Sequence, residues 1–139
     1  MITTKESAVI YVEENIIPSH KEKCLQLLSD IDYGELKNDK AKTIIPSMLV
    51  LMFNEFETMP PPLREIAIGI IGPVEVTQVL NRLCESIDKR SLWDKIDGLD
   101  LDKILAEEFV RGSIEKAHEA VKKTIEKELN NINKNESNN

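Results

Sequence analysis

The fold of this chain is decided by the stretch at residues 46–56, which reads PSMLVLMFNEF. Its apolar side chains surround a helix on nearly every side instead of forming one stripe. A helix of that kind is buried all round, because any exposed face would leave apolar surface in water. We therefore expect a helix from Met48 to Glu57, opened by Pro46 and Ser47, at the centre of a helical bundle.

The composition agrees with one helical domain. The chain has 139 residues, of which 41% are hydrophobic and mostly aliphatic, and this length suits a single domain with a real core. Five glycines are few for the many turns of an all-β fold. The predicted fold class is all-α: a compact bundle of five to six helices, forming one domain over residues 1–132. The polar residues 133–139 are expected to be a disordered tail.

Two helices should precede the central one. The first spans about Thr4 to Ile16 and begins at a capping-box pair, Thr3 and Glu6. Residues 8–12 are rich in β-branched side chains and also suit a strand, so both alternatives stay open. A second capping pair, Ser19 and Glu22, starts a helix that ends near residues 32–34. Residues 35–42 then form a flexible connection or a short exposed helix.

Beyond the central helix, three prolines at residues 60–62 break the chain. Short helices are predicted at 63–71 and 73–88, separated by a tight turn, and one further turn carries Trp93. Asp97 and Gly98 make a turn, and Asp100 is a plausible N-cap for the last helix. These connections are short, as helical bundles prefer.

The last helix starts near Leu101, runs to about residue 132, and suits a kink at Gly112. Its second half carries an apolar stripe opposite a charged face: Ile114, Ala117, Val121, Ile125, Leu129 and Ile132. The stripe repeats every 3.6 residues, the period of a straight helix laid on a core rather than of a left-handed coiled coil. We expect this amphipathic helix to pack across the central one. The sequence leaves open whether the stripe is core or a partly covered interface, for which Ile114, Val121, Ile125 and Leu129 are the candidates.

No recognisable catalytic or metal site is present, and no enzyme activity, metal or cofactor is expected. His20, taken as exposed, and Cys24, taken as buried, lie four apart, but zinc needs two further ligands that nothing nearby supplies. The aspartates at residues 94–102 do not fit a calcium loop, since placing Gly98 at position six puts Trp93 at position one. Glu115 and His118 have a di-iron spacing without the second such motif that the site requires. No glycine-rich phosphate loop or nucleophile elbow occurs either.

Charge and cysteine usage point to a soluble cytoplasmic protein. The formal net charge is −7, which favours solubility and disfavours phosphate or anionic membranes. Cys24 and Cys84 show no paired spacing and read as small buried hydrophobes in a reducing compartment. The apolar region at residues 44–53 is too short to span a bilayer, and the N-terminus lacks a basic, apolar leader, so we expect no membrane association.

Residues 63–88 could instead carry DNA binding. A short helix, a tight turn and a second helix with early polar residues resemble the helix-turn-helix of bacterial transcription regulators. The resemblance implies base or phosphate contacts by Thr77, Gln78, Asn81 and Arg82. The first helix is very apolar, however, the turn is a residue short, and lysines and arginines only balance acids over residues 63–93. Since DNA binding depends on neutralising phosphates, we favour two antiparallel core helices here.

Two functions therefore remain as hypotheses. The leading one is a small acidic, non-enzymatic regulator, adaptor or inhibitor that binds a protein partner through the C-terminal helix, and its acidic charge is compatible with a basic partner. The alternative is a DNA-binding transcription regulator using residues 63–88, which would act as a homodimer because one weakly basic module binds poorly alone.

Overall fold

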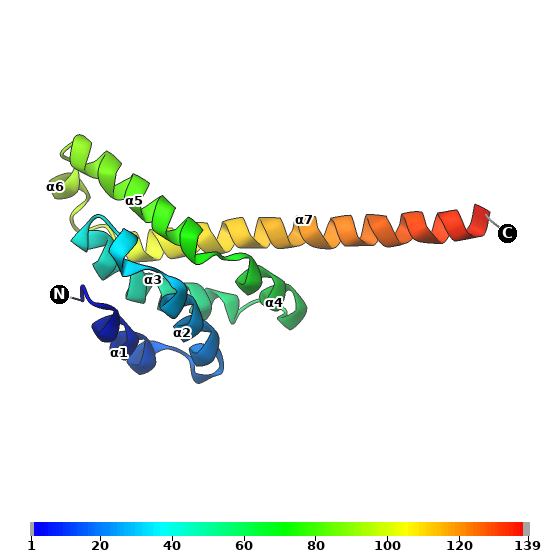
Figure 1. Cartoon of the computed structure of the whole chain (residues 1–139), viewed down its shortest axis with the longest axis horizontal. Coiled ribbons are helices and arrows are strands. Elements are labelled where there is room, and N and C mark those ends of the chain that lie inside the picture. The colour runs from blue at the N-terminus through cyan, green and yellow to red at the C-terminus, as the bar shows by residue number, and fades with distance from the viewer. Residues whose placement is uncertain (1, 138–139) are drawn as a thin grey trace.

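The described residues, 2–137, form an all-α fold in this computed structural model (Figure 1). Within that range no segment is a β-strand, which confirms the predicted fold class. Residues 2–137 contain seven α-helices instead of the five to six predicted, because the single turn at Trp93 counts as one. In chain order they are α1 (Lys5–Asn15), α2 (Lys21–Asp30), α3 (Asp39–Phe56), α4 (Pro61–Ile70), α5 (Pro73–Lys89), α6 (Trp93–Ile96) and α7 (Leu101–Ser137).

The helix α3 lies at the centre of the molecule, as predicted. It contacts α1, α2, α5 and α7, so neighbours surround it on most sides. The Phe53 ring lies 6.0 Å from Phe56, edge to face, and 5.8 Å from His20. The largest α3 side chains are almost completely buried: Ile45, Met48, Leu49, Met52, Phe53 and Phe56. The structure therefore confirms that this segment, apolar on all sides, is the buried central helix.

The start of α3 differs from the prediction. The helix begins at Asp39, nine residues before Met48, and Asn38 caps it by accepting a hydrogen bond from the Lys40 N–H at 2.8 Å. Pro46 lies inside the helix and is buried. A proline there forgoes one helical hydrogen bond. Ala41 and Ile45 are completely buried before it and Met48 after it. The burial of these residues on both sides of Pro46 outweighs the lost hydrogen bond. Pro46 and Ser47 had instead predicted the start of the helix.

The N-terminal helices form where expected but with different caps. Residues 8–12 are helical in α1, so the alternative strand does not form. Thr4 caps α1 by accepting from the Ser7 N–H, and Ser7 accepts in return from the Thr4 N–H, so the capping box is not Thr3 with Glu6. Ser19, the expected cap of α2, lies inside a short 3₁₀ turn at Pro18–His20 instead.

The connection between α2 and α3 is ordered. It contains a second 3₁₀ turn, η2 (Tyr33–Glu35), in which Asp32 accepts a hydrogen bond from the Gly34 N–H at 2.8 Å. Leu36 follows and is buried in the core. A buried anchor and backbone hydrogen bonds fix this segment, which corrects the expectation of a flexible connection at residues 35–42.

The helices α4 and α5 diverge from the turn at Gly72 (Figure 1). Pro61 and Pro62 are the first two residues of α4, where the missing N–H groups would have no helical acceptor. α4 packs on α7, whereas α5 packs on α3 and α2. They are therefore not the antiparallel core pair that we favoured. Gly98 has a φ of +94° before α7, which confirms the turn predicted there.

The longest helix is α7, which has 37 residues and ends at Ser137. It continues five residues past the expected end at residue 132, so residues 133–137 are helix and not a disordered tail. Residues 138 and 139 of that expected tail lie outside the described residues. Figure 1 shows α7 as one nearly straight helix without a kink at Gly112. Within the described part of the chain, no helix combines the length and the apolar character needed to cross a membrane.

The central position of Phe53 predicts a large effect of its truncation. Replacing Phe53 with Ala should lower the free energy of unfolding by about 3–5 kcal/mol, because a cavity would open between α3 and the His20 ring. The matched control is Ile10→Ala on α1, whose side chain is 57% exposed and whose loss should cost less than about 0.5 kcal/mol. Urea titration followed by circular dichroism measures both, and equal midpoints would contradict the central role of Phe53.

Candidate functional site

The two halves of α7 have different surroundings. In its first half, Leu105, Ala106, Val110, Ser113 and Ala117 are buried against α3 and α4. The Ser113 hydroxyl donates to the Val110 carbonyl at 2.9 Å, so the buried polar group in this contact is satisfied. This half packs across the central helix, and of the predicted stripe only its first residues, Ile114 and Ala117, take part in the packing.

The second half of α7 projects beyond the body of the molecule (Figure 1). From residue 118 to residue 135 no side chain is buried, and Val121 is only half-buried. Ile125, Leu129 and Ile132 are 55%, 53% and 51% exposed. Ile114 is half-buried and packs against the core, so it marks the start of the uncovered part. We call the apolar residues from Ile114 to Ile132 the α7 stripe.

The difference in helix length explains why the stripe is uncovered. At 1.5 Å per residue, α3 spans about 27 Å and α7 about 56 Å. The body cannot follow α7 along its whole length, and its contacts end near Ala117. The sequence left open whether the stripe is core or a partly covered interface. Residues 121–132 are therefore not part of the core. Those side chains present apolar surface to solvent.

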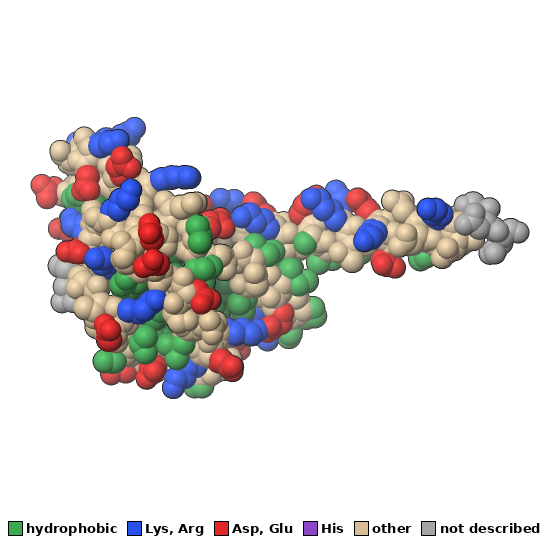
Figure 2. Space-filling view, viewed as in Figure 1, with side chains coloured by type: hydrophobic (Ala, Val, Ile, Leu, Met, Phe, Trp, Pro, Cys, Tyr) green, Lys and Arg blue, Asp and Glu red, His purple; other side chains and the backbone are tan. Residues whose placement is uncertain are grey.

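The remaining surface of the projecting half is charged. Figure 2 shows lysines and glutamates along it, with apolar side chains gathered between α7 and the body. Residues 118–137 contain four lysines and four glutamates, so this segment is neutral while the whole chain carries −7. Attraction by net charge is thus weak here, and apolar contact is the main interaction that the surface offers.

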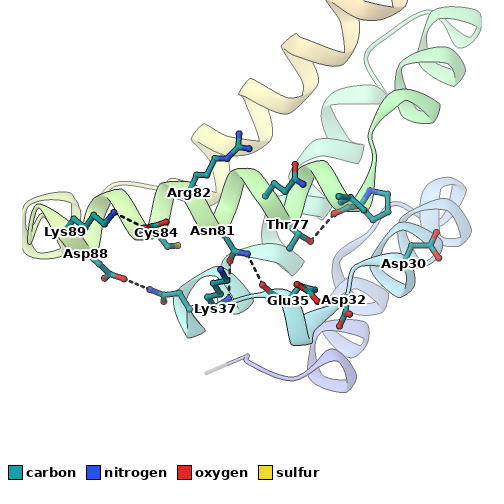
Figure 3. Close-up of a pocket in the computed structure, with 15 residues that line it drawn as sticks. Asp30, Asp32, Glu35, Lys37, Thr77, Asn81, Arg82, Cys84, Asp88 and Lys89 are labelled. Atoms are coloured by element: carbon teal, nitrogen blue, oxygen red, sulfur yellow. Dashed lines mark hydrogen bonds and ion pairs between the residues drawn. The ribbon is translucent and has the colours of Figure 1, made fainter.

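A second candidate is a groove of about 740 Å³ between α5 and the connection that contains η2 (Figure 3). Asn81 joins the two walls: its amide donates to the Glu35 carbonyl at 2.8 Å, and its side-chain oxygen accepts from the Lys37 N–H at 3.1 Å. Asn38 donates to Asp88 at 3.1 Å farther along. Both signs of charge line the groove, with five acidic residues (Asp30, Asp32, Glu35, Glu85 and Asp88) and three basic ones (Lys37, Arg82 and Lys89).

The groove contains the four residues that the helix-turn-helix resemblance singled out, and two of them are already engaged. Thr77 is buried, and its hydroxyl donates to the Pro73 carbonyl at 3.0 Å. Asn81 holds the η2 connection. Gln78 and Arg82 are exposed, and Arg82 points away from that connection (Figure 3). α4 and α5 also pack against different neighbours, so the compact helix pair of such motifs is not formed.

His20 is buried, not exposed as the sequence suggested. Its ring contacts the Glu57 carboxylate, and Arg64 reaches the same carboxylate at 3.4 Å. These contacts connect α3 to the turn before α2 and to α4, which is a structural role. Within residues 2–137, no group of three or more His, Cys, Asp or Glu side chains is placed to hold a metal ion.

Both cysteines are buried and unpaired. Burial raises the pKa of Cys24 to about 12 and also raises that of Cys84, for which the Asp88 carboxylate adds a smaller contribution. The thiolate is the nucleophilic form of cysteine, so neither thiol is set up for reaction at neutral pH.

No family model, curated protein or solved structure matches this chain. The function is therefore argued from the geometry of the two candidate surfaces. Sequence reasoning found the α7 stripe by its period but missed the acidic and basic residues of the η2 connection that line the groove. Their positions depend on Leu36 being buried, which no local pattern indicates.

The contact made by Asn81 predicts that its loss destabilises the protein. Asn81→Ala should lower the free energy of unfolding by about 1–2 kcal/mol, because the Lys37 N–H and the Glu35 carbonyl both lose their partner. Gln78→Ala, one helical turn earlier in the same groove, should change it by less than about 0.5 kcal/mol. Thermal melting compares the two variants, and an unaffected Asn81→Ala protein would refute the anchoring role.

The buried thiol of Cys24 predicts a loss of stability in alkali. Its pKa rises from 9.0 in its usual state to about 12 in the fold, so the unfolded chain loses its proton first. The contribution is complete below pH 9 and disappears as the pH rises toward 12. Cys24→Ala should start from a lower stability but fall less steeply over that range. Urea titrations at a series of pH values test this, and parallel curves for the two proteins would contradict it.

Proposed function

We propose that this protein is a small non-enzymatic regulator or adaptor that binds a protein partner through the α7 stripe. The observation that carries the proposal is the row of apolar side chains, half-buried Val121 and exposed Ile125, Leu129 and Ile132, on a helix that projects from the body. Apolar side chains at helical spacing on one face are the usual anchors of a helix that packs into a groove or against another helix.

The stability of the projecting segment supports the same proposal. Most helical stability in proteins comes from packing of an apolar face, and residues 118–135 of α7 have almost none of that packing. Four asparagines lie among residues 130–135, and asparagine is a poor helix former. A partner that covered the stripe would supply the packing that this half of α7 lacks in the single chain.

The proposal extends to the kind of partner and its compartment. Because residues 118–137 are neutral, the partner's contact surface is expected to be apolar, and a basic partner would have to reach the acidic body as well. The two free, buried thiols suit a reducing compartment such as the cytoplasm. DNA binding is the weaker hypothesis, because Thr77 and Asn81 are used inside the molecule.

The stripe can be tested by making it polar. The double variant Val121→Asp with Ile125→Asp should lose its in-cell protein cross-links to residues 118–135 while keeping the unfolding midpoint of the body, because these side chains make little contact with the core. A matched control, Ile10→Asp with Ile104→Asp, changes two apolar side chains that are 57% and 44% exposed away from the stripe. It should keep the cross-links.

Cross-linking through a photoreactive residue at position 128, followed by mass spectrometry, measures the contact, and thermal melting measures the fold. Cross-links that persist in the double variant would refute the proposal. A lost unfolding transition would show instead that the stripe stabilises the fold of the single chain.

A further inference from the structure

We propose that the groove between α5 and the η2 connection binds a basic segment of a partner protein, with a lysine or arginine side chain beside Asp30, Asp32 and Glu35. The inference goes beyond the proposed function, because this groove is a different surface from the α7 stripe. Its volume of about 740 Å³ lies within the range of roughly 300–1,000 Å³ that is typical of ligand sites. The groove is therefore large enough to hold several side chains of a bound peptide.

Charge is distributed unevenly along the groove (Figure 3). Asp30, Asp32 and Glu35 lie at the end where α5 begins, which we call the acidic end. The α5 residues that line this end carry no charge: Pro73, Val74, Thr77 and Gln78. The basic residues of the groove lie nearer the C-terminal end of α5: Lys37, Arg82 and Lys89. Among the residues that line the acidic end, the charged ones are thus all negative.

The carboxylates at the acidic end have no cationic partner within residues 2–137. Asp30 accepts a hydrogen bond from the Gln26 amide at 3.1 Å, and Asp32 accepts one from the Gly34 N–H at 2.8 Å. The carboxylate of Glu35 forms neither a hydrogen bond nor an ion pair in this part of the chain. Both donors are neutral, so the negative charge at this end is not compensated.

Nearby charged groups are engaged elsewhere. Glu85, at the other end of the groove, forms an ion pair with Lys89 at 2.9 Å. Lys5 of α1 donates to the Ser29 carbonyl at 2.8 Å instead of pairing with a carboxylate of the acidic end. A cation that enters this end is therefore attracted by three carboxylates and has no existing ion pair to displace.

An apolar surface faces these carboxylates across the groove. Val74 is 67% exposed in the first turn of α5, and Pro73 beside it is half-buried. Lysine and arginine side chains combine a long aliphatic stem with a charged head, and the stem packs on apolar surface while the head stays in polar surroundings. A basic side chain matches both features of the acidic end, whereas an apolar or an acidic ligand matches at most one of them.

The groove is formed before any ligand arrives. Asn81 holds the Glu35 carbonyl and the Lys37 N–H against α5, and Leu36 between them is buried in the core. A site that is already ordered loses little conformational freedom on binding. The net charge of −7 also attracts a basic segment from a distance.

The length of the groove favours a protein segment over a small amine. α5 lines the groove from Pro73 to Lys89, which is about 24 Å along the helix. An extended peptide of about seven residues covers that length, whereas a small amine fills the acidic end alone. The occupant that matches the whole groove is a segment of a protein chain that is basic at one end.

The experiment titrates a fluorescent peptide of glycines and serines, with a pair of lysines at one end, with the purified full chain. A salt concentration of about 0.15 M limits the Debye length to about 8 Å and so suppresses attraction by distant charges. Fluorescence anisotropy should show saturable binding with a Kd below about 1 mM. A peptide with glutamates in place of the lysines should bind at least about tenfold more weakly.

Paired variants locate the binding. Asp30→Asn with Glu35→Gln should raise the Kd at least about tenfold, because two unpaired charges are lost while the side-chain shapes and the Asn81 contacts remain. The matched control, Glu13→Gln with Glu14→Gln, removes two exposed charges of α1 outside the groove and should change the Kd less than about twofold. Thermal melting checks that both variants are folded.

A third variant, Val74→Lys, places a tethered cation at the acidic end and should abolish peptide binding. The inference is overturned if no saturable binding occurs, if the control weakens binding as much as the groove variant, or if Val74→Lys still binds. Lysine amide that binds as tightly as the peptide would overturn the assignment to a protein segment. Val121→Asp with Ile125→Asp should bind the peptide as the natural chain does, because the α7 stripe takes no part.

Discussion

The burial of α3 is the constraint on which the rest of this structure depends. A helix that is apolar on nearly every side must be enclosed, so α1, α2, α5 and the first half of α7 all pack against it. Phe53 and Phe56 fill the space between those helices. The proline inside α3 is tolerated for the same reason, since the segments on both sides of it are buried. Position in the core thus overrides a local signal that usually marks a helix start.

The functional proposal follows from a mismatch in length. The central helix α3 spans roughly 27 Å, whereas α7 is about twice that length. Only the first half of α7 can therefore be covered within one chain. The apolar period nevertheless continues to Ile132, and its side chains are half exposed. Our proposal that another chain covers this surface rests on that exposure, since large exposed apolar patches are typical of interaction sites.

The groove beside α5 illustrates how polar residues can be misread. Thr77 and Asn81 stand at the spacing of residues that contact DNA, yet their hydrogen bonds go to Pro73 and to the η2 connection. Asn81 provides hydrogen-bond partners for two backbone groups, the Glu35 carbonyl and the Lys37 N–H, in a segment that lies outside the α-helices. Its role is to hold the connection between α2 and α3 against α5.

The sequence by itself determined the helical class, the central position of residues 48–56, and the period of the stripe, because all three depend on local patterns of apolar residues. It did not determine where α3 begins, where α7 ends or which residue caps α1, and it missed the burial of His20, which depends on contacts distant in the chain. Above all, tertiary structure decided that the stripe is surface and not core beyond Ala117. A periodic pattern shows that a face is apolar, but only the lengths and packing of the other helices decide whether anything covers it.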